Sequence, residues 1–167
     1  MPEAGRFGAL PWVWVSALVF ALDQLTKLYF DGSLHLYQRI VIIPDLFSWT
    51  LAYNTGAAFS FLAEHDGWQR WLFAVIALSV SAVLLLWLRR LPRRGQGWLA
   101  FGLALVLGGA IGNLFDRMVY GHVIDFILVH WQDRWYFPAF NIADCAINVG
   151  AVLLVLDMFK SQKTRSA

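Results

Sequence analysis

Four of the aspartates that interrupt apolar stretches of the chain are candidates for chemistry. Asp23, Asp116 and Asp144 lie within or at the end of long apolar runs, and Asp125 lies in the apolar segment 121–127. Placing a charged side chain in a membrane span costs about 2.5–3.5 kcal/mol, so each of these groups needs a function or a partner. Two carboxyl groups held about 3 Å apart cannot both ionise, and they share a proton. One can then act as a base on water while the other protonates a peptide carbonyl, which is peptide hydrolysis without a metal.

Helical spacing places further polar side chains beside these aspartates. Residues three and four positions apart lie on one face of a helix. Three sets have this spacing and predict polar stripes: Asp23 with Lys27, Asn113 with Asp116 and Arg117, and Asn141 with Asp144 and Asn148. Together with Asn54, the asparagines can donate and accept hydrogen bonds, which suits gripping an extended peptide. Hydrogen bonding between helices is the other interpretation of these amides. We expect Asp116 and Arg117 to hold the segment that carries Asp125, and Asp23 with Lys27 to form an intrahelical pair or a support for the site.

The sequence contains few residues that could form other kinds of catalytic site. The serines of the apolar run 71–88 have no histidine near them, and the four histidines lack the spacing of a zinc site. There is no glycine-rich phosphate loop, and the net charge of +2 is too small to suggest nucleic acid binding. The single cysteine, Cys145, is a candidate nucleophile, but buried cysteine is usually an inert small hydrophobe. The sequence therefore predicts neither a metal nor a cofactor.

Four apolar stretches are long enough to place this chemistry in a membrane. The chain is 59% hydrophobic and only 14% charged, whereas soluble domains are about 25% charged. A membrane helix needs about 20 apolar residues. The predicted spans are approximately 11–30, 71–88, 98–117 and 141–159. Because lipid cannot hydrogen-bond a bare backbone, we expect all four to be helices within one membrane domain, 1–167.

The basic residues predict how these spans are oriented. Eight of the thirteen lysines and arginines fall in the N-terminal segment, in the connection between spans two and three, and in the C-terminal tail. The positive-inside rule then places both termini in the cytoplasm. The polar stripes of spans one, three and four lie near the opposite, outer surface. The sequence therefore predicts a polar site at the outer face of the membrane.

Two segments connect the spans on that outer side. Residues 31–67 contain β-branched and aromatic runs bounded by Pro44 and by the turn 54–56, which predicts a small β-sheet. A short helix lying on the membrane is expected at 57–68. Residues 119–140 are expected to form a shorter loop, in which the apolar patch around Asp125 folds back toward the helices. The predicted fold class is a mainly α membrane protein with a small extracytoplasmic sheet and an interfacial helix.

Five blocks of the sequence resemble the lipoprotein signal peptidases (signal peptidase II). Each block alone is weak, but their combination, order and position relative to the spans are specific, and they cover nearly the whole chain. The blocks are DQLTK at 23–27, NTGAAFS at 54–60, GGAIGNLFDR at 108–117, VIDF at 123–126 and FNIAD at 140–144. One mild departure is Cys145, where the family often has serine.

The resemblance implies a complete hypothesis for the site. Asp125 and Asp144 would be the catalytic pair. The substrate would be a prolipoprotein whose cysteine already carries diacylglyceryl, cut just before that cysteine, and globomycin-type peptides would inhibit. The location would be the bacterial inner (cytoplasmic) membrane, in contact with membrane lipid and with the active site at the periplasmic face. From the residue types and spacing themselves, we expect the supporting or substrate-binding residues to be Asp23, Lys27, Asn54, Gly56, Asn113, Asp116, Arg117, Asn141 and Asn148.

Two other classes of function use the same features. Carboxylates within a membrane also form proton relays in transporters. No polar path continues through the second span, however, which weighs against transport. A non-catalytic chaperone for lipoproteins is the third class, and it would bind the lipidated peptide without cutting it.

Overall fold

Four long helices dominate the molecule. The computed structural model describes residues 7–56, 68–92, 95–132 and 134–165. The helices are α1 (Val13–Ser33), α2 (Trp68–Arg90), α3 (Gly97–Val119) and α4 (Ile142–Arg165), with a short 3-10 helix, η1 (Leu10–Trp12), before α1. Each contains a stretch long and apolar enough to cross a membrane. The four predicted spans are therefore confirmed, with ends shifted by a few residues.

A small antiparallel sheet joins the helices at one end. Its strands are β1 (Arg39–Ile43), β2 (Phe47–Asn54), β3 (Val123–Trp131) and β4 (Trp135–Tyr136), hydrogen-bonded in that order. The predicted sheet is confirmed, but its extent was underestimated. The segment 119–140 was expected to be a loop, and it contains the nine-residue strand β3. The interfacial helix expected at 57–68 lies outside the described residues, except for Trp68, which begins α2.

The apolar patch around Asp125 is a strand that is covered on both faces. Val123, Ile124 and Phe126 are at most 2% exposed. A strand buried on both faces shows no alternation of polar and apolar residues, so periodicity cannot identify it. Phe126 stacks on Phe30 of α1 with ring centroids 4.4 Å apart, which holds β3 against the last turns of that helix.

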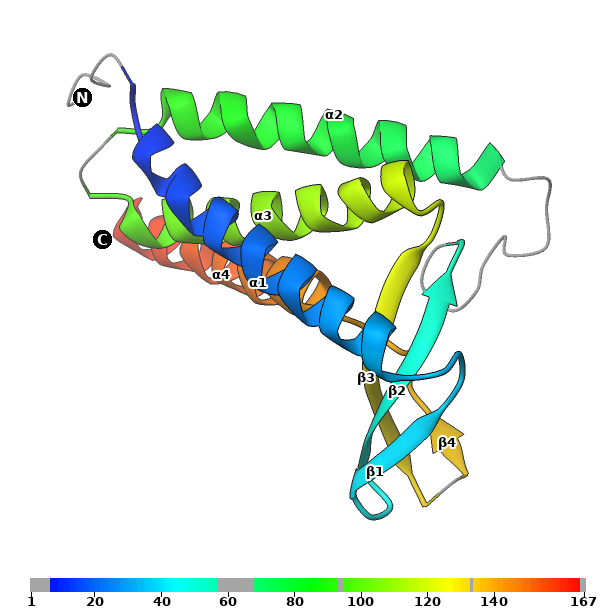
Figure 1. The fold of residues 1–167 in the computed structure, drawn as a ribbon. Helices are drawn as coiled ribbons and strands as arrows, with labels where there is room; N and C mark the ends of the chain where they lie inside the picture. Colours follow the sequence, from blue (N-terminus) through cyan, green and yellow to red (C-terminus); the bar gives the residue numbers. More distant parts are fainter. Residues whose placement is uncertain (1–6, 57–67, 93–94, 133, 166–167) are drawn as a thin grey trace.

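Helix α3 is the centre of the bundle, and each of the other three helices packs against it. Figure 1 shows the sheet at one end of the helices, whereas the start of α1, the end of α2, the start of α3 and the end of α4 lie at the other end. The first half of α3 packs through Leu103 and Leu107 against Leu84 and Leu88 of α2. The polar residues of α3, by contrast, lie at the sheet end.

Glycines in α3 permit this close packing. A Cβ atom on Gly108 would lie 2.8 Å from the backbone oxygen of Ser16 in α1. A Cβ atom on Gly109 would overlap the carbonyl oxygen of Ala143 in the first turn of α4 and lie 2.8 Å from Ile147. Small residues at such contacts are typical of membrane helices. Gly109 therefore sets how closely the start of α4, with Asp144, approaches α3.

We expect Gly109→Ala to lower the stability of the protein, because the backbone of α4 must move to admit the new methyl group. Overpacking of this kind typically costs about 1–3 kcal/mol. The measurement is thermal unfolding of the detergent-solubilised protein. Gly97→Ala is the matched control, since its Cβ would meet only Trp12 at 3.8 Å, an ordinary contact. Equal melting temperatures for the two variants would contradict the role of Gly109.

Candidate active site

The first turn of α4 holds Asp144 through a reciprocal pair of hydrogen bonds. Asn141 precedes the helix, and its Oδ1 accepts a hydrogen bond from the backbone N–H of Asp144 at 2.9 Å. The Asp144 Oδ2 in turn accepts one from the backbone N–H of Asn141 at 3.2 Å. This arrangement is a capping box, with Asp144 in the place usually taken by Glu or Gln. The Asn-x-x-Asp spacing was a signal for this cap that the sequence analysis did not use.

Strand β3 carries Asp125, which is 2% exposed. Asp125 pairs in register with Ala52 of β2, so the strand pairing fixes the position of Asp125 along the sheet. The Nδ2 of Asn141 donates to its Oδ1 at 2.7 Å, and the Nδ2 of Asn54, at the end of β2, donates to its Oδ2 at 3.2 Å. Both carboxyl oxygens of Asp125 are thus held by amides from two different elements.

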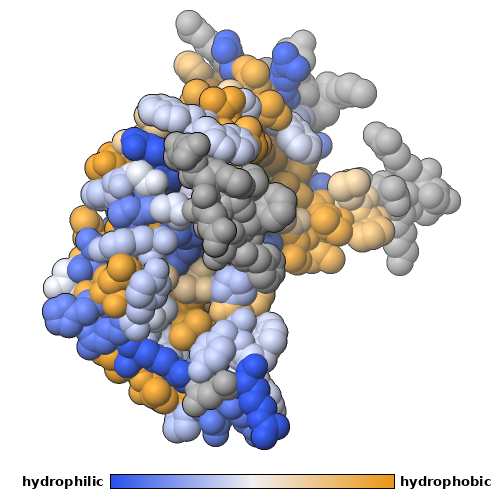
Figure 2. All heavy atoms as spheres, turned by 90° about the vertical axis from the view of Figure 1, so that its right-hand side faces the viewer, coloured by the Kyte–Doolittle hydropathy of each residue, from blue (hydrophilic) through white to orange (hydrophobic). Residues whose placement is uncertain are grey.

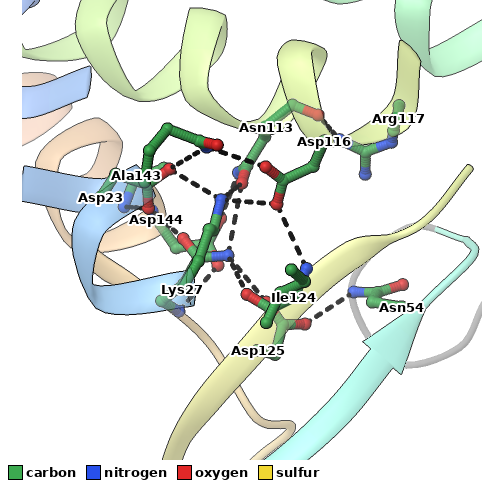
Figure 3. A network of polar contacts seen from close by, with 12 residues as sticks. Asp23, Lys27, Asn54, Asn113, Asp116, Arg117, Ile124, Asp125, Ala143 and Asp144 are labelled. Carbon is green, nitrogen blue, oxygen red and sulfur yellow. Dashed lines mark hydrogen bonds and ion pairs between the residues drawn. The ribbon is translucent and has the colours of Figure 1, made fainter. Parts of the chain in front are cut away.

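Asn141 contacts both carboxyl groups, that of Asp125 through its side-chain Nδ2 and that of Asp144 through its backbone N–H. Figure 3 shows Asn113, Asp125 and Asp144 within one network of polar contacts. Asn113 of α3 completes the connection. Its Nδ2 donates to Asp144 Oδ1 at 2.8 Å, and its Oδ1 accepts from Asn141 Nδ2 at 3.3 Å. The structure therefore brings the two predicted catalytic aspartates into one network, together with three of the four predicted asparagines.

The environment of Asp125 favours a carboxyl group that keeps its proton. Burial, and next the negative charge of Asp144, raise the pKa of Asp125 to about 7. The hydrogen bonds from Asn54 and Asn141 and the positive charge of Lys27 oppose this rise in pKa. A pair of nearby carboxyl groups with one proton between them is the arrangement needed for acid–base hydrolysis.

A buried ion-pair cluster lies directly behind these groups. The Nζ of Lys27 lies 2.7 Å from Asp23 Oδ2 and 2.8 Å from Asp116 Oδ2, and it donates to Asn113 Oδ1 at 3.0 Å. The side chains of Lys27, Asp23 and Asp116 are at most 1% exposed. The predicted pair of Asp23 and Lys27 is present, but Lys27 is shared between helices α1 and α3. The cluster thereby connects α1 to the amide that holds Asp144.

Asp116 also positions the strand that carries Asp125. Its Oδ2 accepts a hydrogen bond from the backbone N–H of Ile124 at 3.2 Å. Its Oδ1 accepts one from Gln24 Nε2 at 2.8 Å. Gln24 was not among the predicted site residues, although a polar amide within an apolar span was a signal that could have indicated it.

Asp23 reaches the start of α4 as well. Its Oδ1 accepts a hydrogen bond from the backbone N–H of Ala143 at 2.9 Å, which satisfies one of the free N–H groups in the first turn of α4. A side chain of α1 therefore helps to cap the helix that carries Asp144. Asp23 therefore supports the site directly, through this hydrogen bond to α4, and not only through its ion pair with Lys27.

The remaining predicted residues lie around the same network. Arg117 donates to the backbone oxygen of Asn113 at 3.2 Å and to that of Gly56 at 3.3 Å, and its guanidinium lies over the ring of Phe73 of α2. Asn148, one turn beyond Asp144, donates to the Asp144 carbonyl oxygen at 2.9 Å. Arg117 therefore connects α3 with the turn after β2, and Asn148 extends the polar stripe of α4.

A cavity of about 630 Å³ opens beside this network. Its polar lining is formed by Asn54, Asn113, Arg117, Asp144 and Asn148, and its apolar lining includes Val123 and the segment 137–140. The volume falls within the range of about 300–1,000 Å³ that is typical of ligand sites. A peptide in this cavity would meet the carboxyl group of Asp144 directly.

Other catalytic arrangements are not supported by the described residues. Within them, no three His, Cys, Asp or Glu side chains are placed to hold a metal ion. Ser48 and His130 do form a pair in the sheet, with 3.0 Å between Oγ and Nε2, which the sequence analysis missed. Both residues are 0% exposed, and Arg39 contacts both of them. Because Arg39 donates to the Ser48 hydroxyl and contacts the same His130 nitrogen that faces it, we interpret this pair as structural.

The chain is similar to known proteins over nearly its whole length. A family model described as signal peptidase (SPase) II matches residues 15–160. A lipoprotein signal peptidase of Pseudomonas aeruginosa is 70% identical over 100% of this chain and 98% of its own. One of Pseudomonas putida is 71% identical over 98% of this chain and 95% of its own. A solved bacterial membrane enzyme has the same fold, with a TM-score of 0.80, 24% identity and coverage of 98% of this chain and 95% of its own.

Proposed function

The chain belongs to the signal peptidase II family of aspartic peptidases, and from this premise we propose that Asp125 and Asp144 cleave prolipoproteins with one activated water. The observation that carries the proposal is that Asn141 hydrogen-bonds both carboxyl groups at the edge of a cavity of about 630 Å³. This arrangement allows the two groups to share a proton and to act on opposite sides of a peptide bond.

The two aspartates differ in burial and in access to the cavity, and this difference assigns the roles of base and acid. Asp144 lines the cavity, and its carboxylate takes a proton from a water molecule there. Asp125 is 2% exposed and has the raised pKa, so it donates its proton to the scissile carbonyl oxygen. The water oxygen bonds to the carbonyl carbon and forms a tetrahedral diol. The proton on Asp144 then passes to the amide nitrogen, the C–N bond breaks, and Asp125 recovers its proton from the diol.

The neighbouring residues hold these groups and the substrate. Asn113 and Asn141 fix Asp144, whereas Asn54 and Asn141 fix Asp125. Arg117 lines the cavity and brings a positive charge to a site where negative charge develops on the carbonyl oxygen. Asn148, also in the cavity wall, can hydrogen-bond an extended peptide backbone.

The substrate is a prolipoprotein with a diacylglyceryl-modified cysteine, cut just before that cysteine. Its acyl chains remain in the lipid while the peptide enters the cavity. Both termini lie in the cytoplasm of the bacterial cell, because eight of the thirteen lysines and arginines are on that side. The active site then lies at the periplasmic face of the inner membrane. Globomycin-type peptides inhibit by occupying the same cavity.

The direct test is incubation of the purified protein with a diacylglyceryl-modified precursor. We expect a shortened, lipidated product on a gel, and we expect the unlipidated precursor to remain uncut. Addition of EDTA should leave the rate unchanged, because the two carboxyl groups supply the acid and the base. Binding of the lipidated peptide without a cut product would contradict the proposal, as would loss of activity in EDTA with recovery in zinc.

The pKa of Asp125 predicts how cleavage and stability depend on pH. The folded protein keeps this proton up to about pH 7, whereas an unfolded aspartate loses it near pH 4. The folded state therefore binds more protons in that window, and the free energy of unfolding should fall as the pH rises from about 4 to about 7. kcat/KM should fall above about pH 7, because the acid is lost. A rate that is constant up to pH 9 would contradict the assignment of Asp125 as the acid.

Cys145 lines the cavity beside Asp144, and its replacement tests whether a thiol takes part. We expect Cys145→Ser to keep kcat/KM within about 2-fold of the parent, because an acid–base mechanism needs no side-chain nucleophile. The measurement is the cleavage rate at several substrate concentrations. A loss of about 100-fold or more would indicate covalent catalysis by the thiol instead.

A further inference from the structure

The far tip of the sheet carries large apolar side chains that face outward. Ile42, Ile43 and Leu46 belong to the β1–β2 hairpin and are 48%, 48% and 43% exposed. Trp131 and Trp135, at the β3–β4 turn, are 59% and 55% exposed. We call these five residues the tip patch. The active site and its cavity use none of them.

The two turns that form the tip patch lie side by side. The backbone oxygen of Leu46 accepts a hydrogen bond from His130 N–H at 2.9 Å, and Leu46 N–H donates to the Ile43 carbonyl oxygen at 3.2 Å. Trp131 and Trp135 are paired directly across β3 and β4. The five side chains therefore lie close together at the tip, where the exposed polar residues Asp45 and Gln132 also lie. In Figure 2, apolar atoms interrupt the hydrophilic surface of the lower part of the molecule, where Figure 1 places the sheet.

The edge strand β1 is apolar along most of its length. It lies at one end of the strand order, and its residues Ile40–Ile43 are 42–52% exposed although they are all aliphatic. Edge strands that face water usually carry charges or proline, because an apolar edge promotes association. Arg39 is the one charged residue of β1. An apolar edge of this composition fits a hydrophobic surrounding better than water.

The lipid-facing surface of α1 continues into β1. Exposed leucines follow one another along α1, and the next exposed apolar residues, Leu36 and Tyr37, lead directly to Ile40. Figure 1 shows the sheet extending sideways from one end of the bundle. Measured along the helix axes, the far end of β1 lies about level with the last turns of α1. Tryptophan is enriched at membrane–water interfaces, which agrees with Trp131 and Trp135 at the tip.

We propose that the tip patch docks into the lipid leaflet on the sheet's side of the membrane, as a membrane contact in addition to the four spans. The part of the bilayer that the patch contacts is the boundary between headgroups and acyl chains. There the aliphatic side chains are buried in lipid, and the indole rings contact both lipid and water. This contact holds β2 and β3 at a fixed depth relative to the membrane surface. It does not depend on which residues are catalytic.

Site-directed spin labelling tests this contact in vesicles of phosphatidylethanolamine and phosphatidylglycerol. The parent for labelling is Cys145→Ser, because Cys145 is the chain's single cysteine. A nitroxide is placed in turn at Ile42→Cys, Leu46→Cys and Trp131→Cys. The matched control is Gln96→Cys, an exposed polar position just before α3, at the end of the bundle opposite the sheet. Circular dichroism of each labelled variant confirms that it keeps the helical content of the parent.

The readout is the accessibility of each nitroxide to oxygen, which dissolves in lipid, and to a water-soluble nickel chelate. We expect the ratio of oxygen to nickel accessibility to be several-fold higher at positions 42, 46 and 131 than at position 96. Equal ratios at all four positions would overturn the proposal, because the tip would then lie in water. Exclusion of both reagents at the tip, with dipolar broadening between labels, would also overturn it and indicate a second copy of the chain as the occupant.

Discussion

Asp125→Asn and Asp144→Asn are each expected to abolish cleavage of the lipidated precursor. Asparagine keeps the shape of aspartate and one of its two accepting oxygens, but it can neither accept a proton from water nor donate one to a carbonyl oxygen. Each general acid or base typically contributes about 10²–10⁴-fold to the rate, and the two groups act as one unit. We therefore expect a loss of at least about 10³-fold in kcat, measured from the product formed by the purified variants.

The stability of the two variants separates lost chemistry from lost folding. In Asp144→Asn the new amide oxygen can still accept the hydrogen bond from the backbone of Asn141, and Asp125→Asn removes a buried carboxyl group. Neither change should therefore lower the melting temperature strongly. Asp45→Asn is the matched control, since Asp45 is an exposed carboxylate at the other end of the sheet with the positive φ that asparagine tolerates. Full turnover by either dyad variant would refute the proposed mechanism.

Lys27→Met is expected to cause the largest loss of stability. The Nζ of Lys27 lies within 2.8 Å of two carboxylates that are completely buried, and methionine would leave both of them without a cation. Removing one partner of a buried ion pair typically costs about 3–5 kcal/mol, because the remaining charge is neither solvated nor paired. Thermal unfolding in detergent measures this effect. The activity should fall together with the folded fraction.

Two further variants show whether unpaired charge is the cause. Arg90→Ala removes an exposed cation at the end of α2, and it should leave the melting temperature nearly unchanged. The triple variant Asp23→Asn, Lys27→Met and Asp116→Asn removes all three charges, and it should be more stable than Lys27→Met alone. If the triple variant is no more stable, the loss in Lys27→Met comes from the hydrogen bonds of the ammonium group, including the one to Asn113, and not from unpaired charge.

Local patterns in the sequence predict the four spans and the polar stripes. Length and hydropathy indicate a membrane helix because the hydrocarbon thickness sets a minimum number of apolar residues. Spacing of three and four places Asp23 with Lys27, and Asn141 with Asp144, on one helical face because the helix repeat is 3.6 residues. These properties depend on neighbours within a few turns, so they can be recognised without any knowledge of the fold.

The sheet was recognised less completely, for a physical reason. β2 lies in a segment bounded by turn residues, whereas β3 is a continuous apolar run that also suits a buried loop or helix. What makes 123–131 a strand is its pairing with β2, and that pairing depends on how the end of α1 and the end of α3 bring the two segments together. Strand pairing between distant segments is not encoded in local periodicity.

The contacts that build the site depend on the packing of the whole bundle. The chain contains the amides and carboxylates, and the family blocks point to Asp125 and Asp144. It does not show that Asn141 holds both, that Asp23 reaches across to cap α4, or that Gln24 and Asp116 position β3. Each of these hydrogen bonds joins separate elements. Their geometry arises when α1, α4 and β3 pack against α3, because side-chain distances between elements follow from their relative placement and not from spacing along the chain.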